Sequence, residues 1–101
     1  MSAKPGPKLQ PETLRRLHRL FPQEYRQEAE QLLFNRCGRV NIDSAVSAAD
    51  VERIRTAALK VSNGKIGALL QAIQLAQVDY RDLLRSAGFS QDAEAHLTWE
   101  P

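Results

Sequence analysis

The chain has few cysteines and histidines, the residues on which most metal, redox and small secreted proteins depend. Its 101 residues include a single cysteine, Cys37, and only two histidines. One cysteine cannot form an intramolecular disulfide, which argues against a small secreted disulfide scaffold. No cysteines or histidines stand at the spacing of a zinc ligand set. The sequence therefore predicts a protein with no metal and no other cofactor.

Long apolar runs and sheet-forming residues are also scarce. No apolar stretch approaches the roughly 20 residues that span a bilayer, and the first residues, MSAKPGPKLQPET, lack the apolar region of a secretory signal. We therefore expect a cytoplasmic protein with no membrane segment. Only six residues are aromatic and β-branched runs are few, which favours helices over sheet.

Apolar residues recur at steps of three and four along most of the chain, which is typical of amphipathic helices. Pro11 suits a first helical position, Asp79 suits an N-cap, and Asn63, Gly64 and Gly88 tolerate the left-handed conformation that ends a helix. We predict an all-α fold, a compact domain with orthogonal or bundle-like packing of about five short helices. Their expected bounds are 11–21, 23–37, 47–62, 65–78 and 79–87.

The charged residues of these helices are expected at the surface. In the first helix, Arg15, Arg16 and Arg19 lie outside the apolar stripe. In the third helix, Glu52 and Arg55 lie mostly outside it. The stripe of the third helix consists of Val51, Ile54, Ala58 and Val61.

The chain divides into three parts by composition. Residues 1–10 contain two prolines and two lysines and predict a flexible basic arm, residues 11–89 predict a single helical domain, and residues 90–101 predict an acidic tail. Apolar residues of the tail alternate with polar ones, which predicts an extended segment with one face on the helices. A continuation of helix through residues 92–97 is the alternative. Residues 39–46 predict a loop.

Charge is unevenly placed along the sequence. Residues 1–22 carry a net charge of +4, and residues 87–101 carry −3. One interpretation is that both ends are solubilising and attract one another weakly. The other is a basic surface that binds nucleic acid or an acidic partner. Its candidate contacts are Lys4, Lys8, Arg15, Arg16 and Arg19.

Few residues are placed for chemistry. Cys37 falls on the apolar face at the end of its helix, where a thiolate is poorly stabilised, so we expect a buried and inert thiol. Asp79 and Asp82 could act as an acid–base pair or hold a cation, but capping of a helix accounts for both carboxylates. Residues 66–86 could also be interpreted as a DNA-binding helix–turn–helix motif. Asp79 and Asp82 argue against this, because they lie at the start of the recognition helix, where acids repel phosphate.

These observations predict a non-enzymatic protein-interaction or regulatory module with an unknown protein partner, and a homodimer is one possibility. The candidate partner contacts are Gln71, Gln74, Tyr80 and Trp99. Trp99 has two interpretations, because so large an aromatic ring is costly to leave in water. It either anchors the tail within the chain or docks onto a partner. Nucleic-acid binding is the alternative function.

Overall fold

A computed structural model of the chain describes residues 9–37, 48–92 and 94–101. Within these ranges the structure has five helices and no strand, which confirms the predicted all-α fold. The helices are α1 (Pro11–Leu20), α2 (Gln23–Arg36), α3 (Ala48–Ser62), α4 (Ile66–Ala87) and α5 (Ala95–Thr98). The predicted loop at 39–46 and residues 1–8 of the predicted arm lie outside the described residues.

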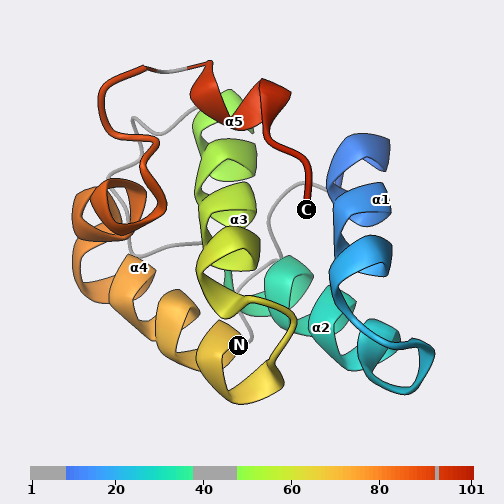
Figure 1. The fold of residues 1–101 in the computed structure, drawn as a ribbon. Helices are drawn as coiled ribbons and strands as arrows, with labels where there is room; N and C mark the ends of the chain where they lie inside the picture. Colours follow the sequence, from blue (N-terminus) through green and yellow to red (C-terminus); the bar gives the residue numbers. More distant parts are fainter. Residues whose placement is uncertain (1–8, 38–47, 93) are drawn as a thin grey trace.

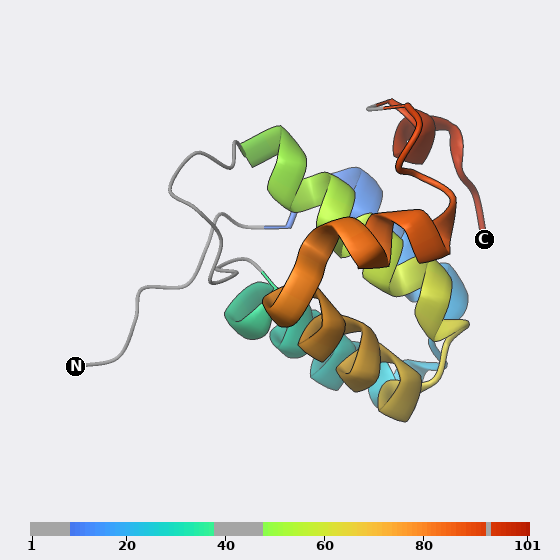
Figure 2. The ribbon, with the colours of Figure 1, turned by 90° about the vertical axis from the view of Figure 1, so that its left-hand side faces the viewer.

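Helix α3 lies in the middle of the fold, with α1 on one side and α4 on the other (Figure 1). Helix α2 packs against α1 and against the first half of α4 (Figure 2). Helix α5 lies across one end of α3, and the chain then runs back between α3 and α1 (Figure 1). The largest apolar side chains that are fully buried are Leu17, Phe21, Leu33, Ile54, Leu59, Leu69, Ile73 and Leu83.

Helix ends occur where local sequence signals predict them. Pro11 is the first residue of α1. Asn63 and Gly64, with φ of 52° and 80°, form the turn between α3 and α4, and Gly88, with φ of 81°, ends α4. The N–H of Phe89 donates to the carbonyl of Leu84 at 2.8 Å, and the Phe89 side chain is buried. This arrangement closes the helix by returning an apolar residue onto its last turn.

The predicted helices 65–78 and 79–87 form one element, α4, interrupted at Asp79. Asp79 has non-helical angles (φ −156°, ψ 94°), and its Oδ1 accepts a hydrogen bond from the N–H of Arg81 at 3.1 Å. This is the geometry of an N-cap, so the break lies where the sequence predicts it.

The expected exposure of Glu52 and Arg55 is wrong. The Arg55 side chain is 0 % exposed, and its Nη1 lies 3.2 Å from Oε2 of the buried Glu52. Glu52 Oε1 accepts hydrogen bonds from the N–H of Gln10 at 2.7 Å and from the hydroxyl of Thr13 at 3.2 Å. Helix α1 has no side-chain cap of its own, so the carboxylate of α3 satisfies and neutralises the α1 N-terminus while it pairs with Arg55.

Val61 is also placed differently from the prediction. Its side chain is 37 % exposed although it belongs to the predicted apolar stripe. The adjacent Ser62 is buried instead, and its hydroxyl donates to the carbonyl of Leu59 at 2.7 Å. That local hydrogen bond satisfies the polar atom and lets the last turn of α3 bury a serine.

We predict that Gly64→Ala destabilises the protein, whereas Gly67→Ala does not. A Cβ at Gly64 would stand 2.4 Å from the carbonyl oxygen of Leu20, and the positive φ adds a cost of about 1–2 kcal/mol. A Cβ at Gly67 meets no atom within 4 Å, and alanine favours a helix by up to about 1 kcal/mol. Urea denaturation of both variants measures the difference. Equal stabilities would contradict this account of the turn.

We also predict strong coupling between Glu52 and Arg55. Glu52→Leu leaves a buried guanidinium without its counter-charge and should cost about 3–5 kcal/mol. The double variant Glu52→Leu/Arg55→Met removes both charges and should recover part of that loss, because the hydrogen bonds of Glu52 to Gln10 and Thr13 stay broken. A double-mutant cycle of unfolding free energies measures the coupling. Additive losses would show that the pair is not an energetic unit.

Candidate functional site

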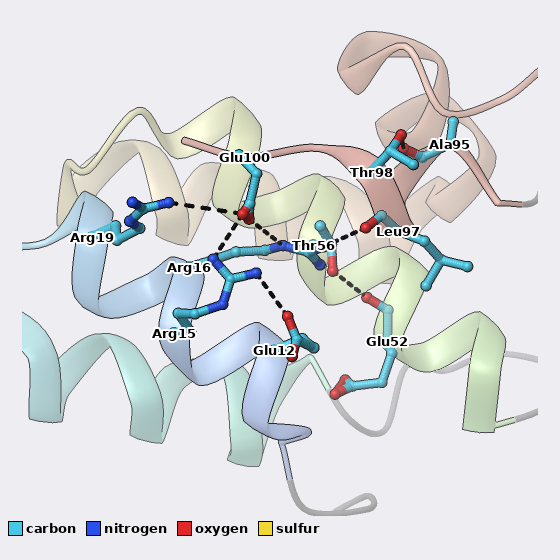
Figure 3. Close-up of polar contacts among 10 residues, drawn as sticks. All are labelled: Glu12, Arg15, Arg16, Arg19, Glu52, Thr56, Ala95, Leu97, Thr98 and Glu100. Carbon is cyan, nitrogen blue, oxygen red and sulfur yellow. Dashed lines mark hydrogen bonds and ion pairs between the residues drawn. The ribbon is translucent and has the colours of Figure 1, made fainter.

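Three arginines of α1 surround one carboxylate of the C-terminal segment (residues 94–101), as Figure 3 shows. Arg15 Nη1 donates to Glu100 Oε2 at 2.7 Å. Arg19 Nη1 lies 3.7 Å from the same oxygen, and Arg16 Nε lies 3.8 Å from Glu100 Oε1. We call Arg15, Arg16 and Arg19 the α1 arginine cluster. The two ends of the sequence, predicted to attract one another weakly, therefore meet at specific side chains.

Arg16 is buried, although the sequence predicts it at the surface. Arg16 is 3 % exposed, and its Nη2 donates a hydrogen bond to the carbonyl of Leu97 at 2.8 Å. The side chain reaches from α1 towards α3 beneath the C-terminal segment (Figure 3). The guanidinium is buried because the segment covers it and supplies both a carbonyl and a carboxylate. Its Nε makes no hydrogen bond.

The cluster carries more positive than negative charge. Its three guanidiniums face two carboxylates, Glu100 and Glu12, and the latter lies 2.7 Å from Arg15. The hydrogen bond from Arg15 is the main reason that the pKa of Glu100 is lowered, and the charges of Arg15, Arg16 and Arg19 lower it further. Glu100 raises the pKa of Arg15 in turn, with a smaller contribution from Glu12. The site therefore favours an anion at the position of the Glu100 carboxylate.

Aromatic rings hold the other side of the C-terminal segment. The Trp99 ring packs edge-on against Phe89, with centroids 6.4 Å apart and planes at 63°. His96 is buried and meets Phe89 at 6.3 Å, and Lys60 Nζ lies 4.9 Å from the centroid of the Phe89 ring. Trp99 is partly buried, so it packs within the chain, as one of its two interpretations predicts.

The backbone before this segment is held by α3. Arg53 Nη2 donates to the carbonyl of Phe89, and it lies 3.5 Å from the carbonyl of Asp92. Arg53 therefore holds the chain before α5, while Arg16 holds the carbonyl of Leu97 within α5.

The extended conformation predicted for the tail is wrong for residues 95–98, which form α5. A helical turn breaks the alternation, because each residue rotates by about 100° and not 180°. His96 is therefore buried, while Leu97, expected on the inner face, is 58 % exposed. The alternative prediction, helix through residues 92–97, is closer to the structure, although α5 begins only at Ala95.

Two of the three candidate contacts of α4 are exposed, and the third packs against the core. Gln71 and Gln74 are exposed, and Tyr80 is partly buried with Arg81 5.7 Å from its ring centroid. The sequence reading missed Val78, which is 86 % exposed. The missed signal was its spacing, four positions after Gln74 and seven after Gln71, which places it on the polar face. We call Gly67, Gln71, Gln74 and Val78 the α4 patch.

The three residues that the sequence offers as a nucleophile or as an acid–base pair are engaged in burial, capping or ion pairing. Cys37 is buried, and this burial raises the pKa of its thiol to about 12. Asp79 caps the second part of α4, and Asp82 lies 3.6 Å from Arg85. Among the described residues, no cluster of three or more histidine, cysteine or acidic side chains could hold a metal ion. Lys4 and Lys8, the other candidate nucleic-acid contacts, lie outside those ranges.

A surface hollow of about 260 Å³ lies between α1 and α2. It is lined by Leu9, Leu14, Glu30, Gln31 and Phe34. Among the described residues that line it, Glu30 is the only ionisable one, so these residues offer no pair of groups for acid–base chemistry.

Comparisons of the chain with protein-family models, with curated proteins and with solved structures gave no match. The helices in the described part of the chain are too short or too polar to cross a membrane.

We predict that acid weakens the attachment of the C-terminal segment, and so raises the exposure of Trp99, before the helices unfold. The folded-state pKa of Glu100 is lowered, so its stabilising contribution is complete above the unfolded value of about 4.3 and disappears as pH falls through the folded value. Trp99 is the single tryptophan, so a red shift of its emission reports this exposure. Far-UV circular dichroism follows the helices.

The variant Glu100→Gln is the control for this titration, because it lacks the titrating group. It should show no separate emission change before the loss of helix. The same early transition in this variant would assign the acid response to another residue.

Proposed function

We propose that this protein is a non-enzymatic interaction module that self-associates through the α4 patch. The observation that carries the proposal is the absence of charge from residues 66–78, the first thirteen residues of α4. At the chain's average of 26 % charged residues, this length would hold about three. Depletion of charged residues distinguishes the centre of a protein interface from the rest of a surface.

The exposure of the patch supports this proposal, because burial alone does not explain the lack of charge. Gly67, Gln71, Gln74 and Val78 are all exposed, yet a solvent-facing helix stripe usually carries charged side chains. Val78 offers apolar surface, and the two glutamines can donate and accept hydrogen bonds across an interface. A second copy presents the same groups, so the patch can pair with itself around a two-fold axis.

Val78→Lys tests this proposal. Two facing patches would each bring a lysine to the shared interface, and like charges there repel. We expect self-association of the wild-type protein at sub-millimolar concentration, and weakening by at least about tenfold, or about 1.4 kcal/mol, in the variant. Sedimentation velocity over a concentration series measures both.

Val61→Lys is the matched control, because it makes the same change at another exposed valine, at the end of α3. It should associate like the wild type. A wild-type protein that stays monomeric throughout the series would refute the proposal, and so would equal weakening by both lysines.

A further inference from the structure

The position of Glu100 suits an anion larger than a carboxylate. Among the three arginines, only Arg15 lies within hydrogen-bond distance of it, at 2.7 Å. Arg19 Nη1 and Arg16 Nε remain at 3.7 and 3.8 Å, and the buried Nε of Arg16 has no hydrogen-bond acceptor. A carboxylate has two oxygens in one plane, whereas a phosphodiester has two charged oxygens and two ester oxygens in a tetrahedral arrangement, which directs acceptors towards more than one guanidinium.

The residue before Glu100, Trp99, indicates that a ligand of this site should also carry an aromatic ring. The Trp99 ring makes a T-shaped contact with Phe89, and Lys60 Nζ lies 4.9 Å from the centroid of the same Phe89 ring. Trp99 thus places a planar ring against Phe89. The next residue, Glu100, places an anion among the three arginines. A nucleotide presents a base and a phosphate in the same way. Stacking of bases on aromatic rings beside a basic surface is how many proteins bind single-stranded nucleic acid.

We propose that the α1 arginine cluster and Phe89 form a binding site for single-stranded nucleic acid, and that Trp99 and Glu100 occupy it in place of a nucleotide. The C-terminal segment is then an intramolecular competitor that nucleic acid displaces. A single strand is required because a base inside a duplex cannot reach the ring. This site lies on α1 and at Phe89, and it is independent of the α4 patch.

The ion pairs of Glu100 are exposed to solvent, as expected if nucleic acid can displace the C-terminal segment. The side chains of Glu100, Arg15 and Arg19 are 42 %, 43 % and 56 % exposed, so solvent screens their contacts. Exposed ion pairs contribute little to stability, and an incoming phosphate can replace them. Arg16 stays in place on α1 and offers its Nε once the segment moves.

Binding of a fluorescein-labelled oligothymidylate of about 12 nucleotides tests the proposal, since single-strand sites cover about 4–16 nucleotides. Fluorescence anisotropy at low salt should show weak binding by the full-length wild-type protein. Glu100→Gln should bind about three to ten times more tightly, because it removes the competing charge and preserves the shape of the side chain. Trp99→Ala/Glu100→Gln should bind more tightly still.

Two control sets separate the site from general electrostatics. Glu94→Gln removes the same charge from an exposed position of the same segment, and it should bind like the wild type. Adding Arg15→Gln and Arg19→Gln to Glu100→Gln should return binding to the wild-type level or below. It should also reduce the dependence of log K on log salt, since fewer phosphates are neutralised. Far-UV circular dichroism confirms that each variant is folded.

Three results would overturn the proposal. The first is equal affinity of Glu100→Gln and Glu94→Gln for the oligonucleotide. The second is tight binding that survives the loss of Arg15 and Arg19. The third is binding of a glutamate-rich peptide, but not of the oligonucleotide, by Glu100→Gln, which would identify a site for acidic peptides.

Discussion

One buried carboxylate, Glu52, fixes how α1 sits on α3. It accepts hydrogen bonds from Gln10 and Thr13 at the start of α1 and pairs with Arg55 within α3. Arg16 follows Thr13 by three positions and therefore lies on the same side of α1. The contact that seats the N-terminus of α1 thus also directs Arg16 towards α3 and the C-terminal segment. The geometry of the arginine cluster depends on these hydrogen bonds of Glu52, although Glu52 touches none of its members in Figure 3.

Local sequence signals predict the parts of the fold that have local causes. Asn63, Gly64 and Gly88 adopt positive φ angles, which asparagine and glycine tolerate better than other residues, and Asp79 caps the helix that follows it. Each of these features depends on a few neighbouring residues, so a single sequence suffices to find it. The all-α fold and most buried apolar positions follow from the same kind of reasoning.

The buried charges could not be predicted in this way. Helical periodicity assigns a charged residue to the surface unless a partner is known, and these partners are distant in sequence. Glu52 reaches residues about 40 positions earlier, and Arg16 reaches the carbonyl of Leu97, 81 positions later. The uneven charge of the two ends predicts attraction between them. It does not predict which arginines meet Glu100, because that depends on where α5 turns the chain.

The C-terminal segment combines contacts of different strength, and this decides what could replace it. The ion pairs of Glu100 are exposed and individually weak, whereas Trp99 and His96 cover a ring in the core. A small anion could replace the carboxylate but would leave Phe89 uncovered in water, at the cost of its burial. The segment is also tethered, so it competes at a high effective concentration. A successful competitor must therefore supply a planar apolar group together with its negative charge, as a nucleotide does and inorganic phosphate does not.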